Sequence, residues 1–411
     1  MNRREFLKFA GATTLGFWSC DLQAWAYGLG GDNPNASKFI VIMLRGAVDG
    51  LSVVIPYGDS RYYSVRNSIA IPKPGEDLSA LDLDGYFGLH PSLAPLLPLW
   101  KNRSLAFVHS AGSPDPTRSH FDAQDYMESG TPGVKSTGSG WMNRLLQQLP
   151  NNNSPIRAIN VGETLPRIFQ GPANVASYQP VQRAGQRKPI DNQMIAQCYQ
   201  AMYEGRNDAL GKAFAEGMNA HDTISKELDG EMMAANAGAP DAGNFKGFGT
   251  QLGKLIAKDP SVQVGFIAIG GWDTHVNQGN GKGQLANKLT ALGNGLSQLI
   301  AALNEQYKNT VIIVMSEFGR TVKENGNQGT DHGHGNMMMV MGGRVNGGKI
   351  YSKWAGLEQN HLYEGRDLAV TTDFRQVLST VAGEHMKVAN PALASVFPDF
   401  QVASQLKGIL A

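Results

Sequence analysis

The sequence predicts an α/β fold with a doubly wound, mostly parallel central sheet and helices on both of its faces. Three observations support this prediction. Near-continuous apolar runs recur along the 411 residues, as expected for parallel strands that are covered on both faces. Segments with helical spacing separate these runs, so strands and helices alternate. The chain is also long enough for a sizeable core, either in one large domain with insertions or in two domains.

The predicted elements follow one another regularly in the first part of the chain. A buried parallel strand is predicted at 38–46 (KFIVIMLRG) and another at 104–112 (SLAFVHSAG). Residues 90–102 between them have the spacing of a short amphipathic helix. A further helix is predicted to start with Ser119 as its N-cap and to end at Gly130.

The pattern changes between about 164 and 260, where a polar loop precedes alanine-rich helical segments. We expect this region to be an inserted helical subdomain. The remaining predicted elements are strands near 155–162 and at 261–271, 309–316 and 336–343, and a helix at 285–306. The chain shows no internal repeat.

Composition excludes some classes of partner. Hydrophobic residues make up 42% of the chain and charged residues 17%, which is ordinary for a globular protein. The net charge is +1, and no block of five or more Lys or Arg residues occurs. The sequence therefore predicts neither nucleic acid nor an anionic membrane surface as a partner.

The N-terminus is typical of a twin-arginine export signal. Arg3 and Arg4 precede a short apolar run, and AWA at 24–26 fits a small-x-small cleavage site. The run is shorter than the ~20 apolar residues of a membrane-spanning helix, so we expect no permanent span. These features predict a signal at 1–26, a mature domain at 27–411, the twin-arginine machinery as a partner, and a periplasmic or secreted location.

Cysteine usage follows from this cleavage site. Cys20 is either removed with the signal or retained as a lipid-attachment cysteine, although Phe17 and Trp18 before it fit the second role poorly. After cleavage Cys198 is the only remaining cysteine, so no intrachain disulfide is expected.

Potential metal ligands follow three separate predicted strands. Asp49 follows the first strand, Asp273 and His275 follow another, and Glu317 follows a third. Because the carboxyl ends of parallel strands lie at one edge of the sheet, these residues are expected to converge. Each also has a purely structural explanation. Asp49 fits a turn, Asp273 fits a helix cap that leaves His275 exposed, and Glu317 fits a salt bridge with Arg320.

The stretch GTDHGHGN at 329–336 adds Asp331, His332 and His334 to the same edge. Its glycines are expected to let the backbone turn tightly enough to point these side chains inward. Carboxylates and imidazoles together suit Zn²⁺, Mn²⁺ or Fe²⁺, and a mixed set also leaves Ca²⁺ and Mg²⁺ open. The sequence thus predicts one or two divalent metal ions.

The segment SPDPTRSHFDAQD contains the candidates for a nucleophile. Thr117, Ser119 and His120 lie where a loop enters a predicted helix, and free N–H groups at a helix start stabilise anions. A hydroxyl group there, activated by a metal, could attack phosphorus or sulfur. Alternatively Ser119 only caps the helix, and His120 is a ligand, an acid or a core residue.

An ordered set of motifs carries a resemblance to a known family. The motifs are LRGAVDGL, HPSLAPL, SHFDAQDYMESG, GGWDTH, SEFGRT, TDHGHGN and GGKIYSKWAGL. They extend through most of the mature chain, which resembles a bacterial family named only as domain of unknown function 1501. That family often carries a twin-arginine signal and looks like a branch of the alkaline phosphatase and sulfatase superfamily.

The resemblance implies an alkaline-phosphatase-like central sheet with two metal ions at its carboxyl edge. It places Asp49 at the carboxylate after the first strand and assigns Asp273 and His275 to one metal. Glu317 stands where the superfamily usually has Asp, and His332 matches a late histidine.

The chain departs from the pattern of the superfamily at one position and from that of the family at another. Phe318 follows Glu317 where the superfamily often has His, which puts the second metal in question. Ala47 replaces an expected glycine, and the position of His334 varies in the family.

Three hypotheses for function follow. The first is an exported metal-dependent hydrolase of phosphate or sulfate esters, in which Ser119 or Thr117 is the nucleophile and Arg118 or Arg320 holds substrate oxygens. The second is a non-catalytic exported metal or ligand binder with the same fold. The third is a partner protein of a cell-surface system, with the helical region 164–260 as its interaction face.

Overall fold

The computed structural model describes residues 36–150, 154, 156–162, 164–178, 201–202, 236–402 and 405–411. The predicted signal at 1–26 and both cysteines lie outside the described residues. Within the described part of the chain, none of the helices combines the length and the apolar character needed to cross a membrane.

In the described part of the chain, a nine-stranded sheet forms the centre. Its strands are, in spatial order, β11 (Ile350–Tyr351), β5 (Leu105–Gly112), β10 (Asn336–Gly342), β9 (Thr310–Ser316), β1 (Lys38–Leu44), β8 (Val264–Ile269), β6 (Ala158–Val161) and β7 (Ala176–Tyr178), and β12 (Thr372–Asp373) pairs with β5. Strand β10 is antiparallel to both of its neighbours, while the other recorded pairings are parallel. The predicted mostly parallel sheet is therefore confirmed.

Strand β1 shows why the apolar run had to be almost continuous. All seven of its residues are buried. Ile40, Ile42 and Leu44 belong to one hydrophobic core, while Phe39 and Val41 belong to a second core on the opposite face. Because successive side chains of a strand point to opposite faces, a strand between two cores needs apolar residues at nearly every position.

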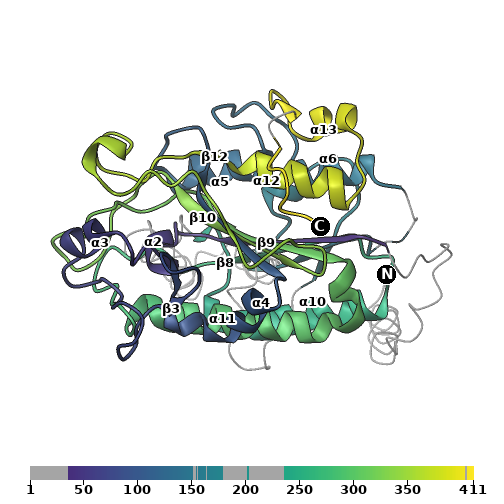
Figure 1. The fold of residues 1–411 in the computed structure, drawn as a ribbon. Coiled ribbons are helices and arrows are strands. Elements are labelled where there is room, and N and C mark those ends of the chain that lie inside the picture. The colour runs from purple at the N-terminus through teal and green to yellow at the C-terminus, as the bar shows by residue number, and fades with distance from the viewer. Residues whose placement is uncertain are drawn as a thin grey trace.

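Helices cover both faces of the sheet, as Figure 1 shows. On one face lie α4 (Leu97–Lys101), α10 (Phe245–Lys258), α11 (Gln284–Leu303) and the 3₁₀ helix η1 (Pro91–Leu96). On the other face lie α5 (His120–Ser129), α6 (Trp141–Gln148), α12 (Phe374–Thr380) and α13 (Asn390–Val396). This arrangement confirms the predicted layers.

The remaining described elements are short. They are α2 (Gly50–Val53), β2 (Val54–Ile55), α3 (Ser60–Val65), β3 (Leu81–Asp82), β4 (Gly88–Leu89), η2 (Arg167–Phe169), η4 (Ala242–Asn244), η5 (Asn304–Asn309), η6 (Gln359–His361) and the π-helical turn η7 (Val381–His385). Strands β2, β4 and β3 form a separate small antiparallel sheet.

Local sequence explains where two helices depart from the predicted ranges. The predicted helix at 90–102 divides into η1 and α4, with Pro95 inside the first and a proline in the first turn of the second. Proline has no N–H to donate, so it interrupts the regular α-helical bonds. Helix α11 ends at Leu303, where Asn304 takes a left-handed φ of 48°, and the chain continues as η5.

The described parts of the region 164–260 are integrated into the main layers. Strand β7 pairs with β6 in the central sheet, and α10 packs along α11. Residues 179–200 and 203–235, where most of the predicted helical insertion falls, lie outside the described residues.

Candidate metal centre

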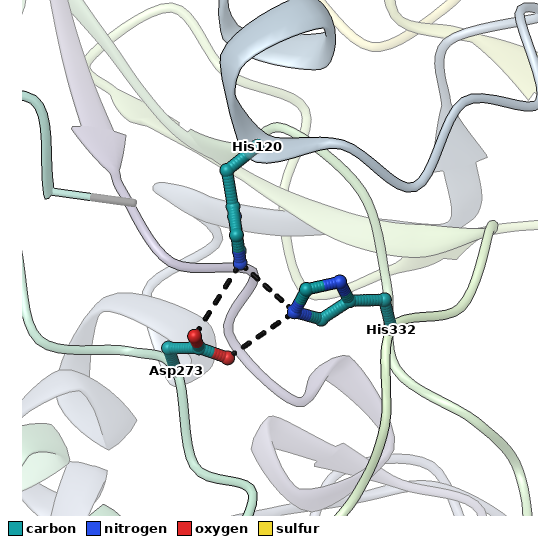
Figure 2. A group of neighbouring side chains, drawn as sticks. All are labelled: His120, Asp273 and His332. Carbon is teal, nitrogen blue, oxygen red and sulfur yellow. Dashed lines mark hydrogen bonds and ion pairs between the residues drawn. The ribbon is translucent and has the colours of Figure 1, made fainter. Parts of the chain in front are cut away.

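Three elements meet where the carboxyl ends of β8 and β9 reach the edge of the sheet. Asp273 and His275 follow β8, and His332 lies in the loop between β9 and β10. His120 is the first residue of α5, whose N-cap is Ser119 as predicted. Figure 2 shows His120, Asp273 and His332 pointing toward one another from these separate segments.

The side-chain atoms of this group have the spacing of ligands around a single ion. One atom each from His120, Asp273 and His332 lie within 4.8 Å of one another. The two Nε2 atoms of His120 and His332 are 3.0 Å apart, and they lie 3.5 and 3.4 Å from the Asp273 carboxylate. Ligands bound to one ion at ~2.1 Å are roughly 3 to 3.5 Å from each other. The three residues are thus positioned to hold a metal ion.

His275 adjoins this group on its exposed side. Its Nε2 lies 3.0 Å from Nε2 of His332 and 2.9 Å from Oδ1 of Asp273. Three imidazole nitrogens and one carboxylate therefore gather at the sheet edge, and these four residues define what we call the metal cluster.

Each histidine of the metal cluster has an acceptor for its other ring nitrogen. Nδ1 of His120 donates to Oε1 of Glu317 at 2.8 Å. Nδ1 of His332 donates to the carbonyl oxygen of Arg118 at 3.0 Å. Nδ1 of His275 lies 3.3 Å from Oδ1 of Asp331. Such partners fix the tautomer and orientation of metal-binding histidines.

This pattern of partners determines what the cluster can bind. If each Nδ1 carries its hydrogen, the Nε2 atoms present lone pairs to one another and to a carboxylate. Lone pairs about 3 Å apart repel unless a cation or proton lies between them. The cluster is therefore chemically suited to a positive charge at its centre.

The acid–base properties of the cluster agree with this. Burial alone would lower the pKa of His120, but hydrogen bonds to Asp273 and Glu317 raise it to about 9. A hydrogen bond to Asp273 likewise raises the pKa of His275. Burial opposes ionisation of Asp273, yet the hydrogen bonds from the histidines and the charge of Arg320 lower its pKa well below the ordinary value. The metal cluster is therefore more stable with a positive charge, from a metal ion or a proton, than with all of its histidines neutral.

Arg320 stabilises the position of Asp273 in the metal cluster. Its buried guanidinium donates to Oδ1 of Asp273 at 2.5 Å. It also donates to the carbonyl oxygens of Gly46, Ala47, Trp272 and Thr330. The structure therefore places Arg320 behind Asp273, as a buried support, and does not present it to a substrate.

Glu317 lies one shell away from the cluster centre. Its Oε1 accepts bonds from Gly46 N, from His120 and from Nε2 of Gln124, and its Oε2 accepts from Ser316. Burial would raise the pKa of Glu317, but the hydrogen bond and charge of His120, together with the bond from Gln124, outweigh burial and lower the pKa. Glu317 thus orients His120, and its oxygens are already occupied by donors.

Asp49 belongs to a different buried network. Its carboxylate pairs with both Nη atoms of Arg66, at 2.6 and 3.0 Å, and accepts further bonds from Ser52 and Gln278. Burial opposes ionisation, yet the charge of Arg66 lowers the pKa of Asp49. The structure does not bring Asp49 into the metal cluster, although it follows β1 at the predicted edge.

The remaining predicted residues divide between the loop and the start of α5. Asp331 is not part of the metal cluster, but it contacts Nδ1 of His275 and the side chain of Asn325. His334 is buried and packs on Tyr363 with ring centroids 4.6 Å apart, and burial lowers its pKa. It is not one of the three residues whose ligand atoms lie within 4.8 Å of one another.

The hydroxyl candidates lie within three residues of His120 in the chain, at the start of α5. Ser119 Oγ accepts the backbone N–H of Asp122 at 3.4 Å, and Thr117 Oγ1 accepts that of Ser119 at 3.3 Å. The Arg118 side chain forms ion pairs with Glu364 and with the buried Asp367. Arg118 therefore contributes its carbonyl group to His332, while its guanidinium is paired with acids.

Sequence reasoning missed two residues that support the ligands. Gln124, four residues after His120 on the same helix face, donates to Glu317. Arg366 donates to the carbonyl oxygen of His332. The i, i+4 spacing was a usable signal for Gln124, whereas no local pattern relates Arg366 to His332.

A cleft of about 340 Å³ lies along α5. Phe121 and Gln124 of α5, one and four residues after His120 in the chain, line it. The other described lining residues are 160–162, 164–167 and 237–240, Phe266 and Ala268 of β8, and Arg45, Asp125 and Glu128.

The fold and site together define an α/β protein with a candidate metal centre at the carboxyl edge of its central sheet. The chain belongs to the family described as "Protein of unknown function (DUF1501)", whose model matches residues 100–397, more than half of the chain. No curated protein matches the sequence.

Several solved structures are similar at low identity. A protein in the alkaline phosphatase superfamily from Vibrio parahaemolyticus is 8% identical, with 78% of this chain and 66% of that chain covered and a TM-score of 0.36. The C-terminal periplasmic domain of EcEptC from Escherichia coli is 9% identical, with 91% and 90% covered and a TM-score of 0.36. BT1596, a 2-O GAG sulfatase, is 9% identical, with 89% and 75% covered and a TM-score of 0.37. These likenesses are too distant to transfer a substrate to this chain.

Proposed function

We propose that the protein is an exported, metal-dependent hydrolase of phosphate or sulfate esters. The observation that carries this proposal is the convergence of three imidazole nitrogens on the Asp273 carboxylate, with each imidazole held by its own outer partner. Side chains positioned in two shells are typical of metal centres. The family resemblance of the sequence supports phosphate or sulfate esters as the substrate class.

The donor set narrows the choice of metal. Imidazole ligands suit Zn²⁺, Cu²⁺, Fe²⁺ and Ni²⁺, whereas Ca²⁺, Mg²⁺ and Mn²⁺ favour sites made of oxygen ligands. We therefore infer Zn²⁺ or another transition metal ion. Because Asp49 is paired with Arg66 and the oxygens of Glu317 are occupied, the described residues support one ion in preference to two.

An ion held by His120, Asp273 and His332 would supply Lewis acidity to an ester oxygen. The chain's own residues contribute positioning and charge. His120 is the first residue of the ten-residue helix α5, so the ion site adjoins the positive end of a helix dipole. Hydrolysis adds water across the P–O or S–O bond and releases an alcohol with phosphate or sulfate. An anionic ester is thus the charge type that this site favours.

Export rests on the N-terminal sequence. Arg3 and Arg4 before a short apolar run, and the AWA motif at 24–26, support the twin-arginine route. The proposed mature protein then functions in the periplasm or outside the cell.

A second candidate function is a metal-binding protein without catalysis. One observation favours it: both hydroxyl groups nearest in sequence to His120, those of Ser119 and Thr117, accept backbone N–H groups at the start of α5. A residue that only caps a helix shows such bonds. Turnover measurements separate this function from the first.

Elemental analysis of the purified mature protein tests the metal centre. We expect about one transition metal ion per chain in the wild type and its loss in the His332→Ala and Asp273→Ala variants. The matched control is His334→Ala, a histidine of the same loop that lies outside the cluster, which should retain the ion. Absence of metal in reconstituted wild type, or equal loss in His334→Ala, would contradict the proposed centre.

Turnover of the metal-loaded protein on phosphate and sulfate esters tests the catalytic role. We expect activity that disappears with the metal and falls in the Ser119→Ala or Thr117→Ala variant. Full activity in both variants would overturn the assignment of a hydroxyl nucleophile. Metal binding without turnover on either ester class would favour the non-catalytic function.

A further inference from the structure

A buried glutamine joins two loops at the carboxyl edge of the sheet. Gln278 lies in the loop between β8 and α11 and is 0% exposed. Its Oε1 atom accepts the hydroxyl group of Thr274 at 2.8 Å and that of Thr330 at 2.9 Å. Both threonines are also fully buried. Because Thr330 belongs to the loop between β9 and β10, a single amide oxygen connects two loops that are distant in the chain.

These two loops carry three of the four residues of the metal cluster. Thr274 stands between Asp273 and His275, and Thr330 comes shortly before His332. Nε2 of His332 lies 3.0 Å from Nε2 of His275 and 3.4 Å from Oδ1 of Asp273. The position of one loop relative to the other therefore sets the distances between ligand atoms at the proposed ion site.

Backbone hydrogen bonds align the same two loops. The N–H group of Thr330 donates to the carbonyl oxygen of Thr274 at 3.2 Å. The N–H group of Gln278 donates to the carbonyl oxygen of Gln328 at 2.9 Å. The side chain of Gln278 thus adds its bonds to a junction whose backbone is already paired.

The charge of Asp49 determines which way the Gln278 amide points. Asp49 is kept ionised by its ion pair with Arg66, and an ionised carboxylate only accepts hydrogen bonds. It therefore selects the amide nitrogen, and Nε2 of Gln278 donates to Oδ2 of Asp49 at 2.8 Å. The amide oxygen is then left to accept from both threonine hydroxyls. Reversal of the amide would place its oxygen against the carboxylate, so this orientation is fixed.

Space filling alone does not account for this arrangement. An apolar side chain of the same length would occupy the space of Gln278. It would also leave two buried threonine hydroxyls without their acceptor, at a cost in free energy. The hydrogen bonds of Gln278, and not only its volume, therefore hold the two loops at their observed separation.

We propose that Gln278 is a positioning residue of the metal centre, which fixes the separation of the two loops that carry the metal ligands. It touches neither the ion nor a substrate, and it acts through the hydroxyl groups of Thr274 and Thr330. The proposal rests on the metal centre of the proposed function but not on catalysis. Residues outside the ligand set affect metal affinity when they hold the ligands at their binding distances.

Removal of the threonine hydroxyls tests the proposal with little change in shape. Valine has nearly the form of threonine but cannot donate to Gln278. We expect Thr274→Val and Thr330→Val each to weaken Zn²⁺ binding about three- to tenfold, as for the loss of one hydrogen bond. The double variant should weaken it about 10- to 100-fold. Competition with a chelating dye measures these affinities.

Thr310→Val is the matched control. Thr310 is also fully buried, and its hydroxyl group donates to the carbonyl oxygen of Gln306 at 2.7 Å, at the start of β9 and away from the carboxyl edge. This variant should lose stability as the other two do but keep the wild-type affinity for Zn²⁺. Stability does not enter the Kd while the metal-free protein is folded, because the ion binds the folded state. Wild-type affinity in both cluster variants, or an equal loss in the control, would overturn the proposal.

The Gln278→Met variant tests whether the hydroxyls act through the amide. Methionine is unbranched and similar in length but has no amide group. We expect Zn²⁺ affinity to fall about 10- to 100-fold, and the two threonine substitutions to cause no further loss in this background. A full additional loss would show that the hydroxyls act independently of Gln278 and would overturn the proposal. If Gln278→Met does not fold, the threonine variants decide the question.

The visible absorption of bound Co²⁺ reports the arrangement of the ligands directly, because its bands depend on coordination geometry. We expect altered bands in the Thr274→Val/Thr330→Val double variant and wild-type bands in Thr310→Val. Wild-type bands and affinity in the double variant would overturn the role of Gln278 and leave the hydrolase proposal standing. Metal-loaded wild type without turnover on either ester class would overturn the hydrolase proposal and leave the role of Gln278 standing.

Discussion

At the scale of single residues, the two nitrogens of each histidine have separate tasks. One nitrogen faces the shared centre, and the other donates to an acceptor that fixes the ring. For His120 that acceptor is Glu317, which is itself buried and held by Gly46 and Gln124. The ionised carboxylate increases the basicity of the imidazole, so Glu317 affects metal binding without touching the ion.

Replacement of Glu317 by Gln tests this indirect role. The amide is similar in size and still accepts a hydrogen bond from His120, but it lacks the negative charge. We expect metal affinity to fall about 10- to 100-fold, measured by competition with a chelating dye, while the ion count at saturation stays the same. Glu305→Gln, at an exposed position, should leave affinity unchanged. Complete loss of the ion at saturation would instead indicate that Glu317 is itself a ligand.

Asp49 gives the contrasting case of a conspicuous carboxylate with a structural partner. It and Arg66 are both fully buried and satisfy each other's charge. We expect Asp49→Asn to lower the free energy of unfolding by about 3–5 kcal/mol, because the guanidinium is left without its counter-charge. The metal content, measured by elemental analysis, should remain that of the wild type. A loss of metal without a loss of stability would restore Asp49 as a ligand.

The ion pair of Asp49 and Arg66 also makes the difference in unfolding free energy between wild type and Asp49→Asn depend on pH. The pKa of Asp49 in the folded protein is lowered from its ordinary value of 3.8. A group with a depressed folded pKa contributes stability above its unfolded pKa and loses it as the pH falls through the folded pKa. The difference between wild type and Asp49→Asn should therefore be constant from pH 7 to about 5 and narrow below 3.8 in denaturant titrations.

At the scale of elements, the loop between β9 and β10, which contains His332, packs its backbone directly against the backbone of neighbouring segments. A Cβ atom at Gly329 would lie 2.2 Å from the carbonyl oxygen of His275, and one at Gly333 would lie 2.4 Å from the carbonyl carbon of Arg320. Neither glycine has a positive φ. These glycines therefore have a different role from the tight turns that we expected. Without a Cβ atom, they leave room for the neighbouring backbone.

A pair of glycine variants in this loop tests that reason. Gly329→Ala should displace the segment that carries His275 and cost about 1–3 kcal/mol of stability, together with weaker metal binding. Gly326→Ala is the control, because a Cβ there would meet nothing within 4 Å. Equal behaviour of the two variants in thermal unfolding and metal titration would contradict the packing explanation.

Prediction from sequence was accurate for elements whose pattern is local. The apolar runs located β1, β5, β8, β9 and β10, and Ser119 and Gly130 marked the two ends of α5. The short strands β11 and β12 were not predicted, because two-residue strands carry no periodicity.

At the scale of the whole molecule, a metal ion would connect segments from three distant parts of the chain. His120, Asp273 and His332 are brought together by α5, β8 and the loop after β9. A ligand that binds only the folded state stabilises it according to its concentration relative to Kd. The proposed ion therefore acts on global stability as well as on chemistry.

Thermal unfolding with and without Zn²⁺ measures this coupling. At 1,000 times the Kd we expect a gain of about 4 kcal/mol and a higher Tm, absent in His332→Ala. The gain should shrink as the pH falls from 8 to 6, because Zn²⁺ must displace the proton that the pKa of about 9 keeps on His120. Protonation of His120 itself stabilises the folded protein with the opposite pH dependence. That stabilisation is fully present below the ordinary pKa of 6.5 and is lost as the pH rises through about 9. A zinc effect that grows toward pH 6 would contradict the assignment of His120 as a ligand.

The sequence by itself determined the α/β layers and the sheet edge at which chemical residues gather, because strand periodicity and the position of residues after strands are local properties. It also singled out His120, Asp273, His275 and His332. Only the tertiary structure decided which of the carboxylates at this edge belong to the metal cluster. Asp49 and Glu317 both follow strands at the same edge, but Arg66 neutralises one and His120 occupies the other. Those partners come from 17 and 197 residues away in the chain, and electrostatic pairing depends on distance in space, which no local pattern encodes.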